Sequence, residues 1–211
     1  PTGARVEMLL LNQRSDGAWE VLLKPGRRVK PGTTVGIDSL DGRPGFEEPL
    51  LAQVVDVTPA GGRVVSFSRP IEPLLDGVGV VPLPPYIHTP LADPERYQTV
   101  YSRVRGSVAA PTAGLHFTPE LLRDLRQAGV EMAFVTLHVS MDTFRPVMEE
   151  DPSEHRMYSE RCELPAGTAE AINRARAEGR RVIAVGTTSV RVLETAGRQL
   201  GERGAPLRPF L

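Results

Sequence analysis

The chain has little of several features that would narrow its class at once. It contains one cysteine, Cys162, so it forms neither an internal disulfide nor a cysteine-rich metal site. It has no apolar run near the roughly 20 residues that a membrane-spanning helix needs. Its formal net charge is -1, so no excess of positive charge indicates a nucleic-acid binder, and any polyanion must be bound by a local patch. We therefore expect a soluble, cytoplasmic protein with no membrane partner.

The composition is otherwise typical of a globular protein. Hydrophobic residues make up 40% and charged residues 24% of the 211 residues, which excludes wholesale disorder. That length suits one large domain or two small ones. Lysine occurs only at Lys24 and Lys30, and arginine supplies the remaining positive charge. Arginine suits bidentate phosphate contacts, but codon bias in the source genome explains the same usage more simply.

Residues 3–77 combine short apolar runs with strong turn signals. The runs cover residues 6–11, 18–23, 33–37, 50–57 and 63–68. They are separated by dipeptides such as Asp16-Gly17 and Gly61-Gly62, in which glycine accepts the positive φ of a tight turn. Several short strands at this spacing predict a small antiparallel β-barrel domain over residues 3–77. We interpret it as a structural or docking module, since it holds no histidine.

After the proline-rich passage 81–87 the hydrophobic period changes. The pattern predicts helices over 93–103, 118–128, 168–178 and 186–200, and strands over 130–139 and 181–185. Alternating helices and strands favour an α/β domain with a mostly parallel sheet. The predicted fold class is therefore α/β, with an incomplete catalytic domain over residues 78–211 added to the small antiparallel β-barrel domain.

Candidate chemistry lies in four segments of this second part. Along the strand 130–139, Thr136, His138 and Ser140 share the face that becomes polar toward the carboxyl end, where open α/β sheets bind ligands. His138 is therefore a candidate acid or base. A structural, hydrogen-bonded histidine is an equally favoured alternative. In the small-residue run 107–118, His116 stands beside a helix start whose N–H groups are free donors, although an ordinary surface loop is the more common outcome for such a run.

The other two segments carry hydroxyl and charged groups. The run 186–191 joins a predicted strand to a helix and offers hydroxyls and amide donors to a nucleoside or carboxylate; a hydroxyl-capped helix is the alternative. It matches neither the Walker loop nor the dinucleotide fingerprint. His155 and Glu160 suit acid/base work or a structural ion pair. Metal binding would need a third ligand, so we expect no metal site.

Five blocks of sequence together resemble a known family. They are Pro82–Ile87, Arg96–Tyr101, Gly106–Thr118, Val135–Val139 and Val185–Arg191. In order and spacing they are similar to the S-adenosylmethionine:tRNA ribosyltransferase-isomerase family of the queuosine pathway, most specifically in the block 106–118. The resemblance covers most of the chain and implies a small β-barrel attached to a larger α/β domain.

The resemblance also implies a reaction and its partners. Such enzymes transfer and isomerise the ribosyl group of S-adenosylmethionine onto 7-aminomethyl-7-deazaguanine at the tRNA wobble position, giving epoxyqueuosine and releasing adenine and methionine. A base must remove a proton from the 5′-carbon beside the sulfonium, and an acid must assist adenine as it leaves. The implied partners are tRNA and S-adenosylmethionine, a co-substrate, with no further cofactor; we favour a monomer.

The motif matches assign the candidate residues. The catalytic candidates are His116 and His138, with His155 and Glu160 as a reserve pair. The substrate-binding candidates are Thr112, Gly114, Thr187, Thr188, Ser189, Arg191, Arg96 and Tyr97.

The chain also departs from the family pattern. Ser140 and Asp142 replace both glycines of the usual His-Val-Gly-x-Gly-Thr-Phe, and Tyr158 stands where a histidine is usual. Relative to that pattern the chain begins inside the barrel region and ends before the carboxyl-terminal part of the α/β domain, as a fragment or a shortened relative would. Two alternatives therefore stay open: a non-catalytic relative that binds tRNA or a nucleoside, and another S-adenosylmethionine-dependent enzyme on the same scaffold.

Overall fold

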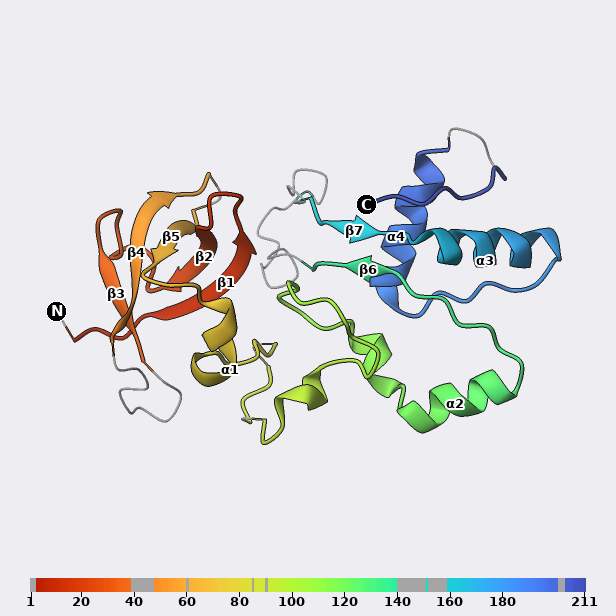
Figure 1. Cartoon of the computed structure of the whole chain (residues 1–211), viewed down its shortest axis with the longest axis horizontal. Coiled ribbons are helices and arrows are strands. Elements are labelled where there is room, and N and C mark those ends of the chain that lie inside the picture. Colours follow the sequence, from red (N-terminus) through yellow and green to blue (C-terminus); the bar gives the residue numbers. More distant parts are fainter. Residues whose placement is uncertain are drawn as a thin grey trace. The chain divides into compact units, whose positions relative to one another are not determined.

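A computed structural model describes residues 3–38, 48–59, 61–84, 86–89, 91–139, 151, 159–200 and 204–211. Its contacts divide the chain into two compact units, Pro1–Pro82 and Leu83–Leu211 (Figure 1). Each unit has a hydrophobic core of its own. The sequence boundary between residues 77 and 78, and the catalytic role given to the second part, stay predictions.

The first unit is built on a five-stranded antiparallel sheet. Its strands are β1 (Glu7–Gln13), β2 (Trp19–Lys24), β3 (Thr34–Ile37), β4 (Leu50–Val57) and β5 (Arg63–Phe67). They pair in the order β1-β2-β5-β4-β3, so among the described residues β1 and β3 are the edges of the sheet, which curls without closing into a barrel. The 3-10 helix η1 (Glu72–Leu74) and the short helix α1 (Leu75–Val78) follow the sheet.

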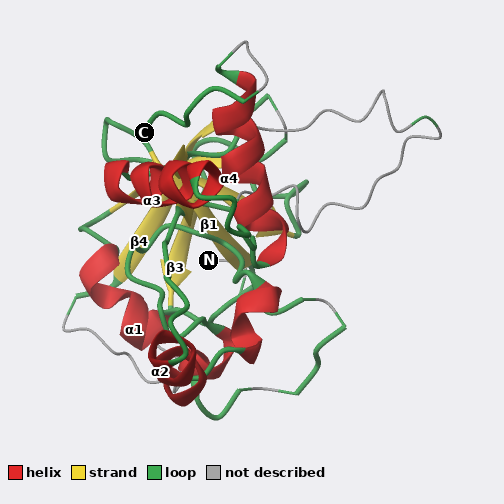
Figure 2. Cartoon of the chain, turned by 90° about the vertical axis from the view of Figure 1, so that its right-hand side faces the viewer, coloured by secondary structure: helices red, strands yellow, loops and turns green. Residues whose placement is uncertain are grey.

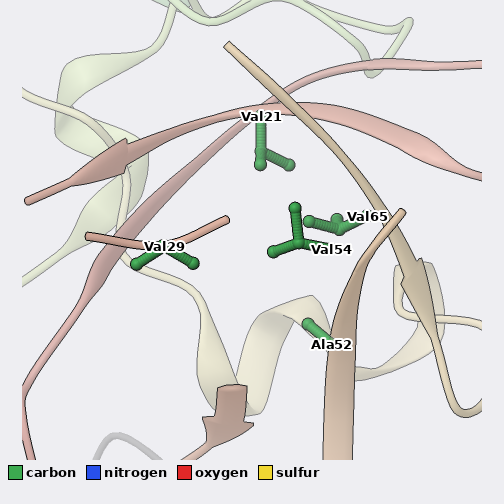
Figure 3. Close-up of a cluster of buried hydrophobic side chains, with 5 residues drawn as sticks. All are labelled: Val21, Val29, Ala52, Val54 and Val65. Carbon is green, nitrogen blue, oxygen red and sulfur yellow. The ribbon is translucent and has the colours of Figure 1, made fainter. Parts of the chain in front are cut away.

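Strand alternation explains where the core of this unit lies. Along β4, Leu50, Ala52 and Val54 are buried while the residues between them are exposed. Figure 3 shows Ala52 and Val54 pointing into the same interior as the buried side chains of Val21, Val29 and Val65. Burying each such valine contributes on the order of 1.5 kcal/mol or more. The sheet is therefore stabilised mainly by its concave face.

The second unit contains short helices around a small core. Its elements are the 3-10 helices η2 (Pro94–Tyr97) and η3 (Thr112–His116), the strands β6 (Thr136–Leu137) and β7 (Cys162–Glu163), and the helices α2 (Pro119–Gln127), α3 (Ala166–Ala177) and α4 (Gly186–Arg198). Leu164, Ala169, Val192 and Ala196 form the core. They pack α3 against α4, which lie adjacent in both views (Figures 1 and 2).

The expected fold class is wrong. Every strand pair in the described part of the chain is antiparallel, and no mostly parallel sheet is present there. The strand expected over 130–139 is reduced to β6, and the described segment 181–185 forms no strand. Ile183, expected to be buried, is 73% exposed. Alternation shows which side chains share a face, but it does not identify the strand that must lie alongside and form the hydrogen bonds.

Three of the four expected helices are present, and the fourth is reduced to a single turn. The expected helix over 93–103 is limited to the single 3-10 turn η2, although Asp93 caps it as its sequence predicts, accepting from the N–H of Glu95. The helices α2, α3 and α4 lie where the pattern predicts them. Thr118 caps α2 by accepting from the N–H of Leu121 at 3.2 Å. Within the described ranges, no helix is long and apolar enough to cross a membrane.

Candidate functional site

Three segments that are distant in sequence meet in the second unit. Helix α4 contacts both β6 and η3. At its first residue, Gly186, an added Cβ would lie 3.5 Å from the Cβ of Ala113 in η3. The start of α4 thus lies against the beginning of η3, and α4 also contacts β6, the strand that directly precedes His138. A common site for His116, His138 and the run 186–191 requires contacts between these three elements.

His138 is positioned by the segment that leads into η3. The N–H of Val108 donates to the carbonyl of Val139 at 3.1 Å, and the N–H of Val139 donates to the hydroxyl oxygen of Ser107 at 3.0 Å. Gly106 has a φ of 120°, and an added Cβ there would come within 3.1 Å of Nδ1 of His138. The half-buried imidazole therefore lies against a position that only glycine occupies without strain.

The other side of the His138 backbone is also held. Its N–H donates to the carbonyl of Arg161 at 2.9 Å, which extends the β6–β7 pairing by one residue. The ring is thus carried by a backbone bonded to two different segments. The backbone that carries the ring is therefore already in place before a ligand binds.

The turn η3 packs closely on the segment before it. Gly114 is buried, and an added Cβ would collide with the phenol oxygen of Tyr101 and come within 2.7 Å of Cγ2 of Thr99. Thr112 and His116, at the two ends of η3, are exposed. Gly114 is therefore a packing position, whereas Thr112 and His116 are accessible to a ligand.

The amino end of α4 has no side-chain cap. Val185 is its N-cap residue, and the hydroxyl of Ser189 donates to the Val185 carbonyl at 2.9 Å. The hydroxyl-capped helix considered above is therefore not what this structure has. The hydroxyls of Thr187 and Thr188 form no hydrogen bond within the described ranges, and the first-turn N–H groups have no intrahelical acceptor. Two hydroxyls and several amide donors are available at this end.

Glu160 and Arg191 form an ion pair. Nη1 of Arg191 lies 2.7 Å from Oε2 of Glu160, whose side chain is 6% exposed against 43% for Arg191. A carboxylate this buried requires such a partner. The two residues, expected in different roles, thus act together. His155, expected as the partner of Glu160, lies outside the described residues, as do Ser140, Asp142 and Tyr158.

Cys162 lies beside this ion pair. Burial raises the pKa of its thiol above the ordinary value; Arg191 lowers the pKa and Glu160 raises it by smaller amounts. The thiol is therefore protonated at neutral pH, and Cys162 is a poor nucleophile. Among the described residues, no group of three His, Cys, Asp or Glu side chains is placed to hold a metal ion.

Arg96 and Tyr97 lie on η2. Arg96 is exposed, while Tyr97 is buried. Burial, and then the nearby Tyr86, raise the pKa of Tyr97. No hydrogen bond or ion pair within the described ranges joins Arg96 or Tyr97 to η3, β6 or α4. No bonded contact in the described part of the chain therefore links these two candidates with the others.

Sequence reasoning missed residues that shape this site. Ser107 and Gly106 position His138, and Tyr101 packs on Gly114. All three lie in blocks that the resemblance had already drawn attention to. A glycine or serine next to a motif histidine is a signal of close packing, but the sequence does not say on which side chain it packs.

Comparisons with known proteins identify the family. The family model described as "Queuosine biosynthesis protein" matches residues 1–207. A protein of Desulforamulus reducens named S-adenosylmethionine:tRNA ribosyltransferase-isomerase is 51% identical over 203 residues, covering 95% of this chain and 57% of the relative. A protein of Thermus thermophilus with the same name is 54% identical over 202 residues. The match covers 94% of this chain and 57% of the Thermus protein.

A solved structure is also similar in sequence. It is an S-adenosylmethionine tRNA ribosyltransferase from Thermotoga maritima that is 29% identical in sequence. The match covers 96% of this chain and 51% of the Thermotoga chain, with a TM-score of 0.32. The chain spans little more than half the length of the curated relatives it matches. The match of the family model along almost the whole chain shows that it belongs to the queuosine biosynthesis protein family.

Proposed function

We propose that this chain acts as an S-adenosylmethionine:tRNA ribosyltransferase-isomerase. The reaction transfers and isomerises the ribosyl group of S-adenosylmethionine onto 7-aminomethyl-7-deazaguanine at the tRNA wobble position, giving epoxyqueuosine, adenine and methionine. Relatives with this name share about half of the residues over most of the chain, which supports the proposal. The structural observation that carries it is the contact of α4 with both η3 and β6, the two elements next to His116 and His138.

The chemistry needs a base and an acid. The sulfonium acidifies the neighbouring 5′-carbon, so a base must take a proton there, and adenine must be protonated or hydrogen-bonded as it leaves. The imidazoles of His116 and His138 supply these two functions. His138 is half-buried, and its backbone is hydrogen-bonded to two different segments. His116 is exposed at the end of η3.

The start of α4 binds the donor substrate. Its first-turn N–H groups and the positive end of the helix dipole suit the carboxylate of the methionine moiety. The hydroxyls of Thr187 and Thr188 steer the ribose, and Thr112 approaches the same substrate from η3. Ser189, whose hydroxyl donates to the Val185 carbonyl, supports the turn rather than the ligand. Gly114 keeps η3 in place by its lack of a side chain.

Glu160 is a positioning residue for Arg191 in this scheme. The carboxylate holds the guanidinium at 2.7 Å, so Arg191 offers its remaining N–H groups in a fixed orientation to an anionic group of the substrate. No metal or redox group is demanded by the reaction. S-adenosylmethionine is consumed as a co-substrate.

The proposal is tested by product analysis. The chain is incubated with labelled S-adenosylmethionine and with tRNA that carries 7-aminomethyl-7-deazaguanine, and released adenine and ribosylated tRNA are measured. We expect both products, and a loss of turnover of at least about a hundredfold in His116→Ala and His138→Ala, because each removes a proton-transfer group. The matched control is His88→Ala, an exposed histidine outside the site, which should keep normal turnover.

The same assay distinguishes the alternatives. Binding of both substrates without adenine release would support a non-catalytic relative, a candidate favoured by Ser140 and Asp142 in place of two glycines. Adenine release that does not depend on tRNA would support another nucleoside-handling enzyme. Near-normal turnover in either histidine variant would remove that residue from the mechanism.

A further inference from the structure

A concave site lies in the second unit, apart from the candidate catalytic and substrate-binding residues. It is a cavity of about 230 Å³ between the segment 100–103, helix α2 and Phe134. Its chemistry is set by Tyr101, Ser102 and Arg103 on one side, Leu122 and Arg126 of α2 on another, and Phe134 on the third. None of these residues was assigned a function above.

Positive charge meets at this cavity from two elements. Arg103 comes from the segment before η3 and Arg126 from the last turn of α2. Neither of these two side chains forms a hydrogen bond or an ion pair within the described ranges. Arg191, which lies outside the cavity, is by contrast paired with Glu160. Two such guanidinium groups on one concavity attract an anion, and their planar donor sets suit phosphate oxygens.

The cavity also offers an apolar surface. The rings of Tyr101 and Phe134 lie with centroids 5.6 Å apart and planes tilted by 50°. Phe134 is 38% exposed and the adjoining Val100 is 53% exposed, so solvent reaches this surface. An accessible aromatic face next to two arginines is the combination on which single-stranded nucleic acid binds, its base stacked and its phosphate held by charge.

Tyr101 connects the cavity with the candidate site. Its ring lines the cavity, and its phenol oxygen lies against Gly114 in η3. Burial raises the pKa of Tyr101, so its phenol is neutral at physiological pH. A group bound in the cavity would therefore be separated by one side chain from the turn that carries His116.

The size of the cavity limits its ligand. Sites for whole small molecules begin at roughly 300 Å³, so about 230 Å³ suits one part of a larger ligand better than a free cofactor. We propose that this cavity binds one nucleotide of an RNA strand, its phosphate between Arg103 and Arg126 and its base against Phe134. The choice of RNA rests on the proposed function; the phosphate-and-base chemistry rests on the cavity.

The test is a binding measurement on the full chain. The probe is a fluorescein-labelled RNA hairpin with a single-stranded loop, titrated at several salt concentrations and followed by anisotropy. The double variant R103Q/R126Q should weaken binding about tenfold or more and reduce the dependence of log affinity on log salt by about 0.7 for each phosphate that the protein no longer neutralises. Arg123→Gln, on the same helix but not lining the cavity, is the matched control and should change affinity less than about twofold.

A second variant separates a nucleotide from a simple anion. Phe134→Leu keeps both arginines and removes the stacking face, and should weaken binding about fivefold or more. Circular dichroism checks that each variant is folded, and calorimetric titration with S-adenosylmethionine should give unchanged affinity in all of them.

Three results would overturn the inference. One is an equal loss of affinity in the Arg123 control, which would indicate general charge attraction. Another is an RNA affinity that is unchanged in Phe134→Leu but reduced in the arginine double variant. That result would show a phosphate site that does not bind the base. The third is a wild-type chain that does not bind the hairpin. Release of adenine in the earlier assay reports separately on the proposed reaction, so the two failures are distinguishable.

Discussion

Gly114 is the residue whose replacement has the clearest steric consequence. We expect Gly114→Ala to lower the free energy of unfolding by about 1 to 3 kcal/mol, because the new methyl group collides with Tyr101 and Thr99. Urea denaturation measures the change. Gly167→Ala is the control, since Gly167 lies in α3 with open space at its Cβ, and alanine there should be neutral or slightly stabilising. Equal effects of the two substitutions would contradict the close packing of η3.

Cys162 reports on the ion pair beside it. Glu160 contributes to raising the thiol pKa and Arg191 lowers it, so Glu160→Gln should lower this pKa and speed alkylation by iodoacetamide, whereas Arg191→Gln should slow it. Rates measured across an alkaline pH series give the pKa directly. Slower alkylation in Glu160→Gln would contradict the electrostatics, provided that both variants keep the wild-type circular dichroism spectrum.

The same thiol has a predictable effect on stability. Its pKa is higher in the folded than in the unfolded chain, so the folded state retains the proton more strongly. The resulting stabilisation is fully present below the unfolded pKa and is lost as pH rises through the folded value. The free energy of unfolding should therefore decrease in the alkaline range as the Cys162 thiol loses its proton. A Cys162→Ala variant should lack this part of the pH dependence.

At the scale of elements, Arg63 holds the first unit together. Nε donates to the Val29 carbonyl at 2.8 Å and Nη2 to that of Gly26 at 2.7 Å, while Nη1 donates to the carbonyls of Gly61 and Gly62. We expect Arg63→Lys to cost about 2 kcal/mol, because an ammonium group cannot reach all these acceptors and leaves partly buried carbonyls unpaired. Thermal unfolding followed by circular dichroism checks this against Arg14→Lys, an exposed arginine on the same unit.

Elements were predictable where local chemistry decides them. The glycine turns at Gly17 and Gly61, both with positive φ, separate strands that lie within two residues of their expected positions. Thr118 and Pro119 likewise begin α2 as expected. The strand expected over 130–139 is nearly absent because a strand also needs a hydrogen-bonding neighbour, and that neighbour is decided by tertiary contacts. Local patterns carry no information about it.

The site was predictable only in part for the same reason. The motif residues of η3, β6 and α4 were found by their resemblance to a family, and the structure brings those elements into contact. The pairing of Glu160 with Arg191 joins residues far apart in sequence, as does the packing of Tyr101 on Gly114. Sequence patterns rank residue types for a chemistry, but contacts between distant segments decide which of them work together.

At the scale of the whole molecule, the position of Tyr101 links two binding equilibria. Its ring faces the arginine-lined cavity while its oxygen rests on η3, so a ligand that restrains the ring on one side also restricts η3 on the other. Where occupancy of one place alters affinity at the other, thermodynamic reciprocity requires the same factor in both directions. A single phenol ring would thus give cooperativity to two ligands that share no atom and touch no common residue besides it.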